Sequence, residues 1–364
     1  MCQADDSSTV TSSQDLSLPV DVLPHVTDVH CHPTDSPLST EAMDDLAIRV
    51  CAMATRASDQ SLVRSLASAY PQTVIPCFGY HPWFTHWISL KPYDSKEAHY
   101  RSLFFGPSSQ NEEYLKAFEK LLTFLPEPIL LDDVLRDLRD NLVAFPNAML
   151  GEVGLDRICR IPYDTPAPTP YMLHDVKREM SPFTIPLEHQ VAILEAQLDL
   201  AVELRRNVSL HSVKSADATV KLFERMKAKH GDNWTEISVD LHSCTVSPPT
   251  LKDIQRKHRN VFMSLSTAIN ERSPGHRDLI AACPDDRILA ESDYPVISRS
   301  TPQTWNMILR IAEVKGWNVE QEWVDDTPEE NWGTVRKLER NWILFEKGRH
   351  TLPPKKKSRN RAPA

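Results

Sequence analysis

Short runs of β-branched and apolar residues recur along the chain, and most are followed by a stretch with helical periodicity. Eight runs fit strands buried on both faces of a parallel sheet, because such strands have nearly continuous apolar sequences. They span residues 26–32, 48–55, 74–82, 148–156, 208–213, 236–244, 261–267 and 288–295. This alternation of strands and helices predicts right-handed β-α-β units around a parallel sheet.

Three of the intervening stretches have clear helical patterns. Apolar residues recur at helical spacing over residues 186–207, where Pro186 suits the first turn. Residues 215–230 form a second amphipathic stretch, with Ser215 in a position to cap it, and residues 59–70 form a third. Eight strands with such helices predict an α/β fold, a (β/α)8 TIM barrel.

A doubly wound open sheet is the alternative architecture. No glycine-rich turn follows the first strand, so a dinucleotide site of the usual kind is not expected in either case. The sequence thus favours a barrel whose function depends on side chains at the strand ends rather than on a phosphate-binding loop.

Two connections are longer than a minimal barrel needs, and they follow strands three and four. Residues 83–147 contain helical patterns over 111–125 and 131–145, whereas residues 157–186 are proline-rich and irregular. Loops at these strand ends shape access to the site, so we expect the insertions to form its wall or lid. Simple surface elaboration is the alternative. The tryptophan-rich stretch 314–332 has no assigned role.

Composition limits the class of protein. The chain has 364 residues, 41% hydrophobic and 25% charged, which is typical of a globular protein with a sizeable core. It has no apolar run long enough to span a bilayer. Its net charge of −9 argues against a broad nucleic-acid-binding surface, although metal ions can still provide positive charge for a phosphate ester.

The two ends differ from the rest of the chain. Residues 1–24 are polar and acidic, and we expect them to be disordered before a barrel domain at 25–350. The basic tail 351–364 is a nuclear-import signal, an anion-binding tail or a solvated disordered end. The 7 cysteines are odd in number and scattered, as in intracellular proteins with reduced thiols. We therefore expect a cytoplasmic or nuclear location, or both. The sequence does not indicate an oligomeric state.

Residues that can bind metal recur near the ends of the predicted strands. They are His30, His32, Glu152, His211, His242 and Asp293. In a parallel barrel these strand ends converge at one mouth. A single buried histidine is usually satisfied by ordinary hydrogen bonds, but the same position in five strands favours one shared site.

Four imidazoles and two carboxylates are enough ligands for two divalent ions. Imidazole suits Zn²⁺ and similar metals, whereas carboxylates also suit Mg²⁺ or Mn²⁺. The two oxygens of Glu152 can bridge a pair of ions. Such a pair can activate a shared water for hydrolysis of a phosphate ester.

The ordered set "DVHCH", "GYHPW", "GEVGLD", "SLHS", "DLHSC" and "AESDYP" resembles the TatD family of metal-dependent hydrolases and deoxyribonucleases. The resemblance runs from about residue 26 to about residue 300. It implies a TIM barrel of the amidohydrolase-like type. The long insertions and extended ends are similar to those of a fungal branch. Some members of that branch are described as interactors of a tetratricopeptide-repeat subunit of the anaphase-promoting complex.

The resemblance also implies a role for each residue. His30, His32 and Asp293 would bind the first metal, Glu152 would bridge to the second, and His211 and His242 would complete that second site. Asp293 would also take the proton from the attacking water, so Asp293 and Glu152 are the expected catalytic residues.

The expected substrate contacts are His81 and Lys214. His81 matches a family position near the phosphate, although a hydrogen-bonded turn residue is the alternative. Family members often have arginine in the loop after the fifth-strand histidine, whereas this chain has Val213 and Lys214. An ammonium cannot form the two-pronged contact of a guanidinium. Cys244 stands where an aromatic residue is usual. These departures bear on the substrate more than on metal binding.

We therefore expect a metal-dependent hydrolase of ester bonds. Its substrate would be the phosphodiesters of single-stranded or short DNA, cleaved in a 3′-5′ exonuclease-like manner. Hydrolysis of another ester or amide, such as a misacylated tRNA, is one alternative. An interaction or scaffold protein of the cell-cycle machinery with vestigial activity is the other.

Overall fold

Eight parallel strands form one nearly closed sheet in the computed structural model, which describes residues 18–105, 111–164 and 178–350. The strands, in spatial order, are β1 (Thr27–Cys31), β2 (Arg49–Met53), β3 (Val74–Phe78), β6 (Met149–Asp156), β9 (Val208–Val213), β10 (Val239–Leu241), β11 (Val261–Leu265) and β12 (Ile288–Ala290). Beyond β12, the Asp293 amide donates to the His30 carbonyl at 2.9 Å. This contact joins the last strand to the first, so the predicted (β/α)8 barrel is confirmed.

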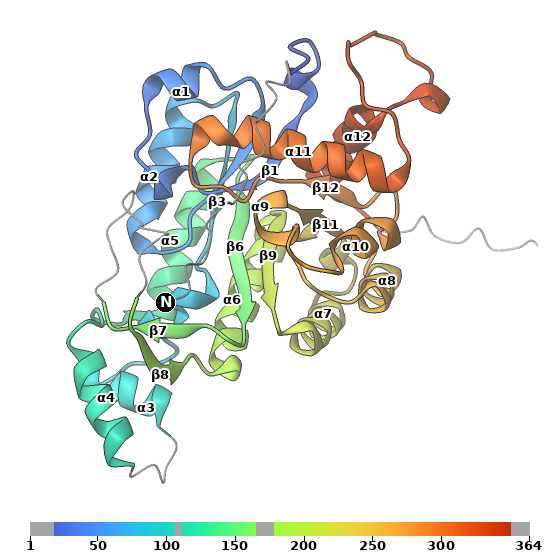
Figure 1. The fold of residues 1–364 in the computed structure, drawn as a ribbon. Coiled ribbons are helices and arrows are strands. Elements are labelled where there is room, and N and C mark those ends of the chain that lie inside the picture. Colours follow the sequence, from blue (N-terminus) through green and yellow to red (C-terminus); the bar gives the residue numbers. More distant parts are fainter. Residues whose placement is uncertain (1–17, 106–110, 165–177, 351–364) are drawn as a thin grey trace, which may run out of the picture.

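Helices surround the barrel, as Figure 1 shows. The helices that follow its strands are α1 (Thr40–Asp44), α2 (Ala57–Ala69), α5 (Leu131–Ala144), α6 (Leu187–Leu204), α7 (Ala216–His230), α8 (Pro248–Lys257), α9 (Thr267–Asn270), α10 (His276–Ala282) and α11 (Ile297–Lys315). Buried faces of these helices and outward-facing strand residues form the largest apolar core. None of the helices in the described ranges is long and apolar enough to cross a membrane.

The last helix, α12 (Thr334–Lys347), covers the end of the barrel where the strands begin. Asn207 and Ser238 directly precede β9 and β10, and both donate to the carbonyl of Phe345 at 2.8 and 2.7 Å. Trp342 and Phe345 belong to a cluster with residues from several strands. This end is therefore packed with apolar side chains, and a ligand site is left to the opposite end.

The three predicted helices correspond to α2, α6 and α7. One detail of the prediction is wrong. Ser215 precedes α7, but its hydroxyl donates to the Val213 carbonyl at 2.9 Å and does not cap the helix. At the start of the chain, residues 18–24 are not disordered as expected, because Val22 is fully buried. The rest of that segment and the tail 351–364 lie outside the described residues.

The insertion after β3 is shorter than expected, because α5 is a helix of the barrel itself. The added elements are η3 (Pro82–Trp87), a short parallel pair of β4 (Ile88–Ser89) and β5 (Ile129–Leu130), α3 (Lys96–Phe104) and α4 (Glu112–Leu122). The side chain of Asn111 accepts from the Glu113 amide at 2.9 Å and so caps α4. The helix predicted at 111–125 is confirmed, and α3 was not predicted.

The insertion after β6 was expected to be irregular, but its two described flanks pair. They form an antiparallel ribbon of β7 (Arg160–Pro162) and β8 (Met180–Thr184). Phe183 on β8 packs against Phe104 and Phe118, with ring centroids 5.2 and 6.2 Å apart. The two insertions therefore share one small apolar core. We call α3, α4, β4, β5, β7 and β8 the insertion lobe; Figure 1 shows α3, α4, β7 and β8 grouped beside the barrel.

The tryptophan-rich stretch between α11 and α12 packs on its own chain. Trp323 stacks on His25 with 3.4 Å between ring centroids, and the Arg336 guanidinium lies 3.7 Å from the Trp323 ring centre. Lys337 lies over Trp317 at 4.7 Å. These contacts give the stretch a structural role beside η1 (Leu23–His25) and α12.

Three buried histidines join the insertion lobe to the barrel, and they make a pH-dependent contribution to stability. His99 Nε2 lies 2.9 Å from the His86 carbonyl, and His189 Nε2 lies 2.9 Å from the Thr85 carbonyl. Burial, together with the neighbouring His189 and His99, lowers the pKa of His86 to about 3. The folded protein therefore holds this ring neutral.

We predict that stability falls as the pH drops below about 6.5, where an unfolded histidine takes up a proton and the folded His86 does not. At pH 5 this residue alone should cost about 2 kcal/mol. Urea unfolding at pH 7.5 and pH 5.0 measures how much free energy of unfolding each protein loses between the two pH values. His86→Leu should lose about 2 kcal/mol less than the wild type. Equal losses in the two proteins would contradict the assignment.

Candidate metal centre

Four of the six residues singled out in the sequence, all histidines, gather around a fifth, Glu152. The Oε1 atom of Glu152 lies 2.9 Å from His211 Nδ1 and 2.7 Å from His242 Nε2. Its Oε2 atom lies 3.7 Å from His30 Nε2 and 3.4 Å from His32 Nε2. One carboxylate thus faces both pairs of the predicted histidine ligands, with one of these pairs at each oxygen.

Asp293 lies at the border between the two pairs. Its Oδ1 is 3.5 Å from His32 Nε2, and its Oδ2 is 3.9 Å from His242 Nδ1. The residue adopts a φ of 49°, which aspartate tolerates better than most residues. The structure therefore brings the predicted set together, while its assignment as metal ligands stays a prediction.

The sequence analysis expected all of these residues near the strand ends, but not all of them lie there. Glu152 is midway along β6, because β6 and β9 continue past it to the Asp156–Val213 pair. A Cβ at Gly154 would lie 2.1 Å from the His211 carbonyl oxygen, so only glycine permits this close pairing. The glycine between Glu152 and Asp156 therefore sets how closely Glu152 and His211 approach.

Burial and charge shift the acid-base properties of the cluster. Burial opposes protonation of His32, but Asp293 and Glu152 outweigh it and raise its pKa to about 9. Burial also opposes protonation of His242, yet Glu152 and Glu291 raise its pKa well above the usual value. Burial would raise the pKa of Glu152, but the surrounding histidines lower it. The carboxylates thus create a negative potential that only protons or a cation can balance.

The donor set fits a divalent cation. His30 Nε2 and His32 Nε2 approach to 3.2 Å beside one oxygen of Glu152. Potential ligand atoms lie within 4.8 Å of one another in each of three groups: His30, His32 and Glu152; His81, Glu152 and His211; and His30, His242 and Glu291. Nitrogen with carboxylate oxygen is the ligand chemistry of zinc and of several other divalent metals. Divalent ions bound here would replace the protons that the histidines otherwise carry.

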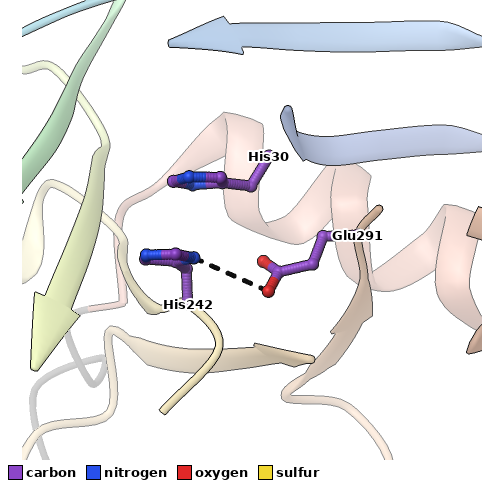
Figure 2. Close-up of side chains that lie close together, drawn as sticks. All are labelled: His30, His242 and Glu291. Carbon is purple, nitrogen blue, oxygen red and sulfur yellow. Dashed lines mark ion pairs between the residues drawn. The ribbon is translucent and has the colours of Figure 1, made fainter. Parts of the chain in front are cut away.

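Sequence reasoning missed three residues that orient the predicted ligands. Glu291 is fully buried, and its Oε1 lies 3.6 Å from His242 Nδ1; Figure 2 shows this pair, with the His30 ring parallel to that of His242. Asp156 Oδ2 lies 3.7 Å from His211 Nε2, and Ser209 Oγ lies 2.7 Å from His30 Nδ1.

The strand period could have revealed two of them. Asp156 is four residues after Glu152, and Glu291 is two residues before Asp293, so each carboxylate shares a face with a predicted ligand. Second carboxylates of this kind fix the ring orientation of metal-binding histidines.

His81 joins the cluster, whereas Lys214 does not. His81 Nδ1 accepts a hydrogen bond from the Trp83 amide at 3.1 Å, and its Nε2 lies 3.3 Å from Glu152 Oε1. Burial lowers the pKa of His81 to about 4, so its neutral ring carries the proton on Nε2 and directs it at Glu152. Lys214 is exposed after β9 and does not line the central cavity formed by the described residues. Its substrate contact stays a prediction.

A cavity of about 790 Å³ opens over this cluster. His32, Glu152, His211 and Asp293 line it, so the centre is accessible to a ligand from outside. A closed parallel barrel that presents such a cluster beside an open cavity defines the class of metal-dependent barrel hydrolases.

Comparison with known proteins gives the family. The model of the family "TatD related DNase" matches residues 27–335, and the chain belongs to this family. It is a metal-dependent hydrolase, as the sequence motifs indicated. This match confirms the resemblance seen in the sequence.

Two curated fungal proteins are similar over most of the chain. The Cut9-interacting protein scn1 of Schizosaccharomyces pombe is 30% identical over 325 residues, which cover 81% of this chain and 94% of that protein. A protein of Saccharomyces cerevisiae named as an uncharacterized deoxyribonuclease is 29% identical over 280 residues, 74% of this chain and 83% of its own.

Solved structures show the same fold. The TatD homolog YJJV from Escherichia coli has a TM-score of 0.56 at 18% identity and covers 89% of this chain and 98% of its own. An uncharacterized amidohydrolase from Saccharomyces cerevisiae has a TM-score of 0.53 at 13% identity and covers 88% and 99%. The barrel is therefore shared with these proteins.

We predict that Glu152→Ala removes most of the bound metal, because both oxygens that face the histidine pairs are lost. Elemental analysis of the purified protein should show a fall in metal per chain, whereas Glu119→Ala on the exposed face of α4 should retain the wild-type content. Full metal content in Glu152→Ala would contradict the proposed centre. Circular dichroism of both variants verifies that the barrel is folded.

Proposed function

We propose that this protein is a deoxyribonuclease that hydrolyses phosphodiester bonds of single-stranded or short DNA, acting from the 3′ end with two divalent ions. The observation that carries the proposal is the division of Glu152 between His30 with His32 on one oxygen and His211 with His242 on the other. A carboxylate in this position would contact both ions of a two-metal site. The printed names of the family and of the yeast relative add support for DNA as the substrate.

The side chains would divide the work as follows. His30, His32 and Asp293 would hold one ion, His211 and His242 the other, and Glu152 would contact both. Bound Mg²⁺, Mn²⁺ or Zn²⁺ would acidify a water molecule and neutralise charge on the phosphate. Asp293 borders the open cavity and lies near both histidine pairs, so it would accept the proton of the attacking water.

We predict that Asp293→Asn lowers kcat/KM on a single-stranded oligonucleotide about 10²- to 10⁴-fold, the range for loss of a general base. The reaction should require added divalent metal and release nucleotides from the 3′ end. Asp286→Asn, an exposed change beyond α10, should cleave at the wild-type rate. Metal-dependent cleavage of an aminoacyl ester but not of DNA would instead favour a misacylated tRNA as the substrate.

A second function is proposed from the name of the fission yeast relative, which describes a protein that interacts with Cut9. We propose that this chain also binds a tetratricopeptide-repeat subunit of the anaphase-promoting complex, in the nucleus or cytoplasm. Such binding would use the protein surface and would not need the metal centre.

We predict that Glu152→Ala binds the Cut9-like protein of the same organism with the wild-type Kd, because Glu152 is buried within the barrel. Calorimetry with purified proteins measures this. Absence of a complex with the wild-type chain would rule out the second function and leave the first intact.

A further inference from the structure

We propose that a second cavity beside the metal centre binds one nucleobase of the substrate, and that Trp83 is the surface on which this base stacks. The inference rests on the proposed nuclease function and specifies how that site selects its substrate. The cavity has a volume of about 360 Å³, within the range of about 300–1,000 Å³ for small-ligand pockets. It is therefore large enough for one flat ring but not for a folded strand.

Residues of the two insertions form one side of this cavity. Trp87, Phe124 and Leu125 line it from the insertion after β3, and Ile161, Pro162 and Met180 line it from the ribbon of β7 and β8. Five residues, Arg56, Trp83, Phe84, Asp156 and Ile158, line both this cavity and the one over the metal centre. A ligand can thus extend from one cavity into the other.

Trp83 lies at the junction with its indole held in place. Its Nε1–H donates to Asp156 Oδ2 at 2.7 Å, and its side chain is nevertheless 45% exposed. Because its indole N–H already has a hydrogen-bond partner, the exposed part of Trp83 can contact a ligand only through the face of its ring. Flat aromatic surfaces of this kind are how proteins bind the bases of single-stranded nucleic acids.

The same contact sets the distance to the reactive centre. Asp156 Oδ2 also lies 3.7 Å from His211 Nε2, and the ring centroids of Trp83 and His211 are 6.5 Å apart. A base stacked on Trp83 is therefore separated from the metal-binding histidine by about one sugar. This spacing suits the nucleotide that carries the phosphate to be cleaved.

Charge in the cavity favours a nucleotide over a purely apolar ligand. Arg160 donates to the main-chain carbonyls of Met180 and Ser181, and among the described residues no carboxylate lies within ion-pair distance of it. The Arg56 guanidinium lies 5.1 Å from the Phe84 ring centre at the junction of the two cavities. Aromatic faces beside guanidinium groups match a ligand that combines a base with a phosphate.

The test compares two ligands that differ only in the base. Calorimetry with the metal-loaded protein would measure the Kd of 2′-deoxyadenosine 5′-monophosphate and of 2-deoxyribose 5-phosphate. The wild type should bind the nucleotide about 5- to 150-fold more tightly, the range for one stacked base. Trp83→Ala should bring this ratio close to one, and Trp83→Phe should keep most of it.

Two further variants separate stacking from folding. Ile158 lines both cavities and is 59% exposed. Ile158→Trp would place a larger side chain between the two cavities, so it should also reduce the Kd ratio without disturbing the core. Ile343→Ala, on the exposed face of α12, should leave the ratio unchanged. Equal binding of both ligands to the wild type, or an unchanged ratio in Trp83→Ala, would overturn the proposal.

Oligonucleotide cleavage distinguishes this proposal from the nuclease function. Metal-dependent cleavage together with a Kd ratio near one would refute the base site and support the nuclease function. A large ratio that depends on Trp83, without cleavage of any oligonucleotide, would support the base site and refute the nuclease. A 3′-terminal abasic residue should slow cleavage by the wild type and have little effect on Trp83→Ala.

Discussion

The site depends on one buried carboxylate shared among five imidazoles, which come from several strands and the segments that follow them. Glu152 is 5% exposed; its Oε2 faces His30 and His32, and its Oε1 faces His81, His211 and His242. This arrangement requires β1, β6, β9 and β10 to hold their register, because a shift of one residue would turn a ligand away from the centre. The closed sheet meets this requirement, and the Asp293 amide takes part in closing it through the His30 carbonyl.

The barrel and the insertion lobe contribute different properties to the same site. The barrel supplies the buried polar cluster around Glu152. The lobe supplies an apolar wall beside it, built around Phe183 and the aromatic residues of α3 and α4. Asp156 connects the cluster to η3, the first element of the insertion after β3, because one of its oxygens lies near both His211 and the indole of Trp83. Changes in the insertion lobe can therefore alter which substrate binds while the polar cluster of the barrel stays the same.

The sequence predicted the barrel and the convergence of the site because both follow from strong periodic signals. Apolar runs mark the strands, and period-two alternation places His30 with His32 on one face. It could not predict the ribbon, because β7 has three residues and only Ile161 of them is buried. It also could not show that the Ser215 hydroxyl donates to the Val213 carbonyl. A serine before a helix can bond either to a helix amide or to a nearby carbonyl, and the sequence does not distinguish the two.

The metal centre also affects the stability of the fold. Burial and the neighbouring His242 lower the pKa of His30, and the two rings stack with centroids 3.7 Å apart. The neighbouring carboxylates raise the pKa of His242, which favours a protonated, positively charged His242 ring. That positive charge disfavours protonation of the stacked His30 ring. A cation between imidazole nitrogens and carboxylate oxygens removes this conflict, because it needs the histidines neutral and the acids ionised. Metal binding would therefore favour the closed barrel, since His30 and Asp293, whose side chains would bind the cation, also join β1 to the segment after β12 through their main chains.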